Sequence, residues 1–245
     1  MRFDVITLFP ELFAPFLTSG VTRRAYESGL VEVKLWNPRD YAEGNYKRVD
    51  DRPFGGGPGM VMLAEPLALC LAAIRAERAS SNDPVVLFSP VGKVLNHAAV
   101  ESWSASQGAV LICGRYEGID QRFINKHVTH EISLGDFVLS GGEIAAMALL
   151  DAVARLQPGV LNDEGSHQLD SFNPALDGLL DCPHYTRPDA WQDQTVPGAL
   201  MSGNHALIER WRREQRLSLT QRQRPELVQK ARAAEQLSSK DEIFL

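Results

Sequence analysis

Three stretches of the sequence end an apolar run in glycine or proline and then begin a helix-like pattern. They are "SLGDFVLSGGEIAAMALL" from residue 133, "VLICGRYEGID" from residue 110 and "VVLFSPVGK" from residue 85. Glycine between a strand and a helix lets the backbone come close to a ligand. No basic residue is common to the three turns, so together they offer backbone N–H and C=O groups beside an apolar wall. That chemistry suits an adenine and a thioether better than a triphosphate.

The segment "LSGGE" (residues 139–143) also matches the signature loop of ABC-type ATPases. An ATPase needs a second motif, the GxxxxGK[ST] loop that holds phosphates, and the sequence contains none. It also lacks the GxGxxG, HExxH and GxSxG patterns of dinucleotide-binding proteins, metalloproteases and serine hydrolases. The five-residue match is therefore interpreted as a coincidence.

The elements that must carry these turns alternate along the first 157 residues. Apolar and β-branched runs predict strands, and periodic apolar patterns between them predict helices. This alternation indicates an α/β fold with a mostly parallel sheet that helices cover on both faces. Ligands of such sheets bind at the carboxyl ends of the strands, where the glycine turns lie. The predicted strands are 3–8, 31–36, 85–88, 109–113 and 132–133, and the predicted helices are 11–17, 22–27, 65–78, 96–104, 119–127 and 143–156.

Two long irregular segments, 37–60 and 157–188, interrupt this pattern. Loops of such length in compact domains are usually functional or disordered. The second segment is interpreted as a linker, because the chain beyond it becomes helical and basic. Residues 205–232 hold eight arginines and lysines against three acids, although the whole chain carries a net charge of −6. A basic patch on an acidic protein favours contact with a polyanion at one place, and a solvated helix face is an equally good interpretation of charge alone.

Composition excludes several classes of protein. Hydrophobic residues make up 44% of the chain and charged residues 23%, as in ordinary globular proteins. No uncharged apolar run is long enough to span a bilayer, so we expect no membrane association. Three distant cysteines without CxxC spacing favour reduced thiols in a cytoplasm. Because the histidines show no metal spacing either, we expect no metal site.

Ten segments in order resemble the bacterial tRNA (guanosine-37-N1) methyltransferases, and they cover nearly the whole chain. They are "LFPELF", "GVTRRA", "NPRDY", "VDDRPFGGGPGM", "FSPVG", "ICGRYEGID", "SLGDFVLSGGE", "DSF", "GLLDCPHYTRP" and "LMSGNHALIERWRREQ". Ten segments in register are far more specific than one glycine motif.

The resemblance implies a SPOUT methyltransferase, in which an α/β domain with a deep C-terminal trefoil knot precedes a small helical domain. It implies a homodimer with active sites shared between subunits, a tRNA substrate bound by its anticodon stem-loop, no DNA partner, and a role for Mg²⁺ that stays open. S-adenosyl-L-methionine would be the methyl donor. Matching motif to motif, its pocket would contain Ser89, Pro90, Gly114, Tyr116, Glu117, Gly118, Leu134, Gly135, Asp136, Phe137, Val138, Leu139, Gly141 and Gly142.

Two further residues are candidates for catalysis. Asp151 lies four residues before Arg155 on the same predicted helix, so an (i, i+4) ion pair would explain this arginine simply. The other neighbours of Arg155 are mostly apolar, however, and the resemblance implies a role close to the guanine base. Asp170, fixed by the "DSF" match, is the candidate general base, and the alternative is that it caps a helix beginning at Ser171 and Phe172.

The resulting expectation is a knotted donor-binding domain at 1–160, a linker or lid at 161–174, and a helical tRNA-binding domain at 175–245. We expect methyl transfer to N1 of guanosine 37. Two alternatives stay open: a knotted methyltransferase that acts on another RNA nucleotide, and a non-catalytic RNA-binding module whose main feature is the basic C-terminal helices.

Overall fold

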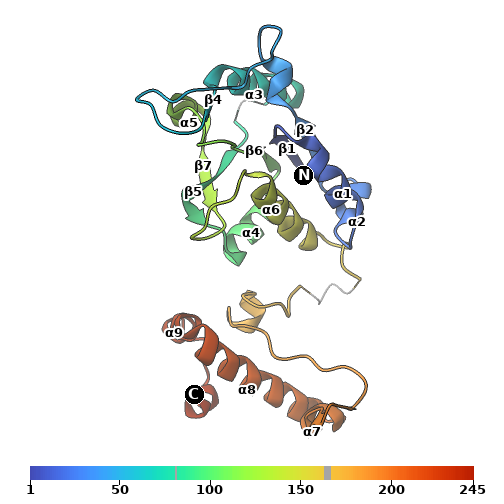
Figure 1. Ribbon diagram of the computed structural model, residues 1–245. Helices are drawn as coiled ribbons and strands as arrows, with labels where there is room; N and C mark the ends of the chain where they lie inside the picture. The colour runs from blue at the N-terminus through green and yellow to red at the C-terminus, as the bar shows by residue number, and fades with distance from the viewer. Residues whose placement is uncertain (81, 163–166) are drawn as a thin grey trace. The chain divides into compact units, whose positions relative to one another are not determined.

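The computed structural model describes residues 1–80, 82–162 and 167–245 of the 245-residue chain. The chain forms two compact units, Met1–Leu161 and Asn162–Leu245, which are drawn in Figure 1. Part of the expected linker 161–174, residues 163–166, lies outside the described residues.

A sheet of five strands forms the centre of the first unit. Its strands are β1 (Arg2–Ile6), β2 (Glu32–Trp36), β5 (Val85–Val94), β6 (Gly108–Ile112) and β7 (His130–Ser133). They lie in the order β2-β1-β6-β5-β7, and every neighbouring pair is parallel. The structure thus confirms the prediction of an α/β fold with a mostly parallel sheet.

Helices cover both faces of this sheet. They are α1 (Phe13–Thr18), preceded by the 3-10 turn η1 (Pro10–Leu12), α2 (Arg23–Glu27), α3 (Ala64–Arg78), α4 (His97–Ser104), α5 (Gln121–His127) and α6 (Glu143–Arg155). Helices α1, α2, α4 and α6 contribute to one apolar cluster, and α3 and α5 contribute to the other. Because both faces of the sheet are covered, the central strand β6 is a continuous apolar run in which every residue is buried, whereas the edge strand β2 carries the charged residues Glu32 and Lys34.

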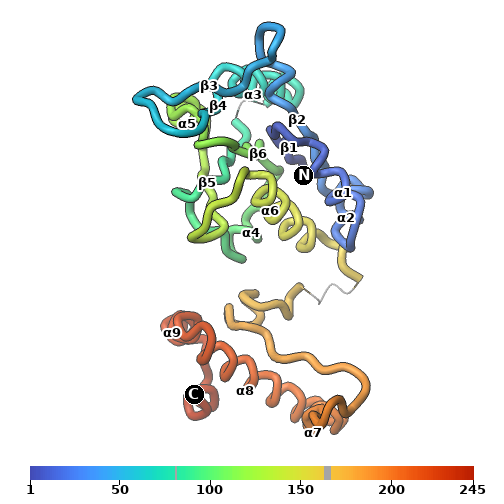
Figure 2. The backbone as a smooth tube through the Cα atoms, viewed as in Figure 1, coloured from blue at the N-terminus to red at the C-terminus, as the bar shows by residue number. Residues whose placement is uncertain are grey.

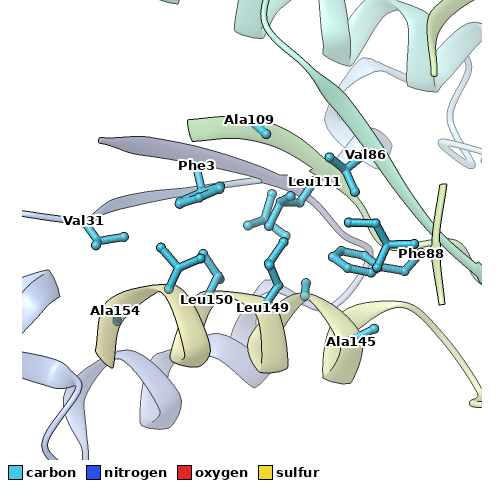
Figure 3. Packing of buried hydrophobic residues seen from close by; sticks show 14 of the residues in the cluster. Phe3, Val31, Val86, Phe88, Ala109, Leu111, Ala145, Leu149, Leu150 and Ala154 are labelled. Carbon is cyan, nitrogen blue, oxygen red and sulfur yellow. The ribbon is translucent and has the colours of Figure 1, made fainter. Parts of the chain in front are cut away.

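Helix α6 is held against the sheet by large apolar side chains. Leu149 and Leu150 are fully buried, and Figure 3 shows them pointing toward the strands that carry Phe3 and Leu111. Full burial of one such leucine contributes about 1.5–3 kcal/mol. This packing fixes the place where α6 begins, directly after Gly142.

Strand β5 continues beyond residue 88, where the sequence predicted its end. Phe88 and Lys93 both pair with Ile132 of β7, so the register shifts between them and the intervening residues leave the regular ladder. A Cβ on Gly92 would lie 2.5 Å from the backbone of Glu131 and Ile132, which explains the glycine there. The irregularity brings Ser89 and Pro90 to the carboxyl edge of the sheet.

The long segment 37–60 is ordered along part of its length. It contains the 3-10 helix η2 (Pro38–Tyr41) and strand β3 (Asp50–Asp51), which pairs with β4 (Val61–Met62) in antiparallel fashion. Its end is fastened to the turn after β6, because Glu117 N donates to Met60 O and Met62 N to Gly118 O, both at 2.9 Å. The glycine-rich part of the loop therefore lies next to one of the three predicted ligand turns.

The second unit has its own small core. Its elements are η3 (Pro174–Leu176), β8 (Ala190–Trp191), β9 (Gln194–Thr195), α7 (Gly198–Met201), α8 (His205–Gln223), α9 (Pro225–Ala233) and α10 (Ser239–Phe244). Figure 2 traces α8 and α9 as its consecutive main helices. Leu179, Leu217, Val228 and Ala231 form the apolar cluster of this unit.

Candidate functional site

A cavity of about 510 Å³ lies at the carboxyl ends of β5, β6 and β7. This is the edge at which parallel α/β sheets bind ligands, and the volume falls within the range of small-molecule sites. The residues that line it are Leu87, Phe88, Ser89, Pro90, Val91, Gly114, Arg115, Tyr116, Glu117, Gly118, Ile119, Gln121, Ile124, Glu131, Ile132, Ser133, Leu134, Phe137, Val138, Leu139, Ser140, Gly141, Gly142 and Ala145.

The structure brings twelve of the fourteen predicted donor-site residues together in the lining of this one cavity. Only Gly135 and Asp136 lie outside the lining. Gly135 instead forms a tight turn with Ser133, whose hydroxyl accepts from Gly135 N and donates to Gly135 O, both at 3.1 Å. All three turns that the sequence predicted to hold a ligand therefore line this cavity.

The glycines before α6 are explained by protein atoms rather than by space for a ligand. A Cβ on Gly142 would lie 2.7 Å from Cys113 Cα, and Gly142 N donates to Gly114 O at 3.0 Å. A Cβ on Gly141 would lie 2.2 Å from Nε of Arg115. A side chain at residue 141 would therefore collide with Arg115 before it reached the ligand space.

Gly114 behaves differently. A Cβ there would meet only Ile119 and Leu87, at 3.7–3.8 Å, which is ordinary van der Waals contact. A small side chain at this position would therefore enter the cavity wall without a clash in the protein.

The turn after β6 holds Tyr116 in an unusual backbone conformation. Its φ angle is 61°, and Gly118, two residues later, has a φ angle of 137°. Tyr116 is half-exposed, and burial, followed by the nearby carboxylate of Asp50, raises the pKa of its phenol. The aromatic ring thus forms part of the cavity wall in its neutral state.

The sequence did not identify several residues that line the cavity. Arg115 lies within "ICGRYEGID", directly between Gly114 and Tyr116, which the sequence did predict to line the pocket. Gln121 and Ile124 of α5 lie three positions apart, so they share one face of that helix. Ser133 is the last residue of β7 and also lines the cavity.

The two catalytic candidates belong to different units. Arg155 is the last residue of α6 in the first unit and is half-buried, and the carboxylate of Asp151 accepts a hydrogen bond from Thr22 Oγ1 at 2.9 Å. Asp170 is half-buried in the second unit. A common site for Arg155 and Asp170 therefore stays a prediction.

The alternative role of Asp170 as a helix cap is wrong. The 3-10 helix that follows begins at Pro174, and its N-cap is Asn173, whose side chain accepts from Ala175 N at 2.9 Å. Asp170 contributes to this turn with its backbone, since its carbonyl accepts from Asn173 N at 3.2 Å.

The arginines of α8 divide into two kinds. Arg213 contacts Asp177 at 2.7 Å and Asp241 at 3.0 Å, and Arg216, which is buried, contacts Asp181 at 3.4 Å. These contacts hold α8 within its unit. By contrast, Arg210 is exposed and Arg212 is half-exposed, and each forms an ion pair with a glutamate of its own helix, Glu214 and Glu209 respectively.

Residues 1–80, 82–162 and 167–245 contain no group of three or more His, Cys, Asp and Glu side chains that could hold a metal ion. In the same ranges, no helix has the length and apolar character needed to cross a membrane.

Comparison with known proteins links this geometry to one family. The model of the family described as tRNA (Guanine-1)-methyltransferase TrmD matches residues 1–230. A tRNA (guanine-N(1)-)-methyltransferase of Polaromonas sp. is 80% identical, and the match covers 100% of this chain and 96% of the relative. Proteins with the same description from Paracidovorax citrulli and Bordetella pertussis are 71% and 56% identical over the whole chain, covering 97% and 96% of their own lengths.

Proposed function

The chain belongs to the tRNA (guanine-1)-methyltransferase family, and we propose that it transfers a methyl group from S-adenosyl-L-methionine to N1 of guanosine 37 in tRNA. The observation that carries this proposal is the cavity at the carboxyl ends of three parallel strands, lined by the turns that match the family motifs. The high identity to relatives over the whole chain supports the same reaction.

The cavity suits the donor by its chemistry. Leu87, Ile132 and Leu139 offer apolar surface for an adenine, and the turns at residues 114–118 and 140–142 offer backbone polar groups for the ribose and the amino acid part. S-adenosylmethionine supplies a methyl group on a sulfonium, which leaves as a neutral thioether once that group is transferred.

The acceptor atom needs help from the protein. N1 of guanine carries a proton at neutral pH, so its lone pair attacks a methyl group only after that proton has left. We assign the carboxylate of Asp170 as the base that takes the proton. Negative charge then develops on O6, and the guanidinium of Arg155 stabilises it. The N1–CH₃ bond forms as the S–CH₃ bond breaks, and the electron pair of that bond stays on sulfur.

We propose that the two catalytic candidates, Arg155 and Asp170, act together in active sites that a homodimer shares between its subunits. Exposed apolar side chains on the first unit support a partner subunit there: those of Val91, Val94 and Val138 are 81%, 55% and 83% exposed. We also infer a trefoil knot in the first unit, on the ground of the family to which the chain belongs.

The second unit is proposed to bind the anticodon stem-loop. The exposed residues Arg210, Arg222 and Lys230 and the half-exposed Arg212 are the candidates for phosphate contacts, whereas Arg213 and Arg216 form ion pairs with acids from other segments of the unit. A tRNA substrate implies that the enzyme works in the cytoplasm.

The test is methyl transfer to two tRNA transcripts that differ only at position 37. We expect labelled methyl incorporation into the transcript with guanosine at this position, and none into the matched transcript with adenosine. Mapping of the product should show methylation at N1. Equal labelling of both transcripts would assign the enzyme to another nucleotide.

A further inference from the structure

A buried ion pair, Arg115–Glu143, lies behind the cavity wall and has no role in the chemistry described above. Its two residues come from different elements: Arg115 lies in the turn after β6, and Glu143 is the first residue of α6. Nε of Arg115 donates to Oε1 of Glu143 at 3.1 Å, and Nη2 lies 3.0 Å from Oε2. Arg115 lines the cavity, so the pair connects its wall to the interior.

The pair is fastened at both ends. Oε1 of Glu143 also accepts from Thr7 Oγ1 at 2.9 Å, and that hydroxyl accepts from Phe9 N at 3.0 Å. The guanidinium of Arg115 lies 4.4 Å from the centre of the Phe9 ring and donates through Nη1 to Ser140 O at 3.2 Å. We call these five residues, Thr7, Phe9, Arg115, Ser140 and Glu143, the Arg115 clamp.

Stability alone explains this arrangement poorly. Glu143 is only 1% exposed, and its Oε2 has no well-directed hydrogen bond among the described residues. Removal of such an ion from water costs several kcal/mol, and buried ion pairs are often no more stabilising than apolar side chains of similar volume. A buried pair of this kind does, however, fix geometry, because neither partner can move away without leaving a charge unpaired.

The geometry it fixes is that of the cavity. The side chain of Arg115 crosses Gly141 so closely that a Cβ there would lie 2.2 Å from Nε. The guanidinium thereby binds the turn after β6 to Ser140 on the turn before α6, and both turns line the cavity. The Thr7 hydroxyl links the same carboxylate to the end of β1, an interior strand of the sheet.

We propose that the Arg115 clamp sets the spacing of these two cavity walls, so that Arg115 and Glu143 are positioning residues for methyl-donor binding. The donor's identity in this statement rests on the proposed function. The alternative is that the pair merely stabilises the fold, as any buried pair would.

A matched control separates the two accounts. Asp4 lies on β1, the strand that ends next to Thr7. Its side chain is 0% exposed and accepts hydrogen bonds from Arg2 and Arg78 at 2.7 Å each. Asp4 does not line the cavity, and neither do its two arginine partners. Asp4→Asn and Glu143→Gln therefore remove the same charge from equally buried ion pairs, and only one of these pairs adjoins the cavity.

The experiment compares the full-length parent, Glu143→Gln and Asp4→Asn by calorimetric titration with S-adenosylhomocysteine, by thermal unfolding, and by kinetics. We expect both variants to unfold at lower temperature. Only Glu143→Gln should bind the ligand about tenfold more weakly, because the two cavity walls lose their fixed spacing. Its KM for the donor should rise to the same extent, while its KM for tRNA and its kcat at saturating donor stay within about threefold.

Thr7→Val provides a second, milder variant if Glu143→Gln does not fold. It removes one hydrogen bond to Glu143 at nearly constant volume and should weaken ligand binding by about threefold to tenfold. Ligand affinity that is unchanged in the folded variant, or lowered equally by Asp4→Asn, would overturn the proposal and leave a purely stabilising pair. A parent protein that does not bind S-adenosylhomocysteine at all would instead contradict the proposed function, and with it this inference.

Discussion

Gly142 packs directly against the backbone of Cys113, so that a Cβ at residue 142 would lie 2.7 Å from Cys113 Cα. The same glycine donates its N–H to Gly114 O. The turn before α6 and the turn after β6 therefore touch backbone to backbone. One of these glycines leaves no space for any side chain, whereas its neighbour across the contact, Gly114, has space on its cavity side.

This difference predicts opposite effects for two alanine substitutions. Gly142→Ala should lower the free energy of unfolding by about 1–3 kcal/mol, because the backbone of Cys113 must move. Gly114→Ala should leave unfolding nearly unchanged but weaken the binding of S-adenosylhomocysteine, because its methyl group enters the cavity wall. Thermal unfolding and calorimetric titration of both variants check this. Normal ligand affinity in Gly114→Ala would place the ligand elsewhere.

Substitutions of the arginines of α8 should also have two different effects, one on tRNA affinity and one on stability. Arg210→Glu with Arg212→Glu should reduce tRNA affinity and lower the slope of log affinity against log salt by about two, if both contact phosphates. Arg213→Gln should mainly lower the stability of the second unit, by about 1–3 kcal/mol, since it leaves Asp177 and Asp241 without their partner. Filter binding at several salt concentrations and urea unfolding distinguish these outcomes. Unchanged tRNA affinity in the double variant means that this face of α8 is only solvated.

Much of the fold could be predicted from the sequence, because its signals are local. Both faces of the sheet are covered, so its central strand is a continuous apolar run that ends at glycine, as residues 109–114 show. Contacts between distant segments were not accessible in this way. That Gly141 makes room for Arg115 depends on two turns meeting in space, and nothing near residue 141 indicates it. Spacing places Arg213 and Arg216 on one helix face, but their acidic partners come from elsewhere in the chain.

Acid should unfold the second unit partly through Asp241. Its hydrogen bonds from Arg213 lower the pKa of this carboxyl to about 2, from an ordinary value of 3.8. A carboxyl with a lowered pKa in the folded state stabilises the protein above its unfolded pKa, and this contribution is lost as the pH falls from about 4 toward 2. Asp241→Asn should therefore lower stability at pH 7 and flatten its dependence on pH in that window. Chemical unfolding from pH 7 to pH 2.5 measures both. A variant with the parent's pH dependence would show that this ion pair does not contribute.

A homodimer with shared active sites predicts complementation between inactive subunits. Arg155→Ala and Asp170→Ala should each be inactive as pure dimers. After the two are mixed and allowed to exchange subunits, about a quarter of the parent activity should return, because half of the dimers are then mixed and each contains one intact site. Methyl transfer before and after exchange is the measurement. A mixture that stays inactive supports sites built within one subunit.

The chemistry itself predicts the effect of a single change, Asp170→Asn. The amide is nearly isosteric with the carboxylate but cannot accept the proton of guanine N1. The turn that follows should persist in this variant, because Asn173 caps it and the backbone carbonyl of Asp170, which accepts from Asn173 N, is unchanged. General-base catalysis typically contributes about 10²–10⁴-fold, so single-turnover methyl transfer at saturating donor should fall by that order. The affinities for tRNA and for S-adenosylhomocysteine should stay within about threefold of the parent, which separates loss of the base from loss of binding. Asp181→Asn, which changes another half-buried carboxylate of the same unit, controls for the loss of charge, and its rate should stay close to that of the parent. If Asp170→Asn transfers methyl groups nearly as fast as the parent, the proton must leave by another route, and the base must be sought among the other carboxylates that face the substrate.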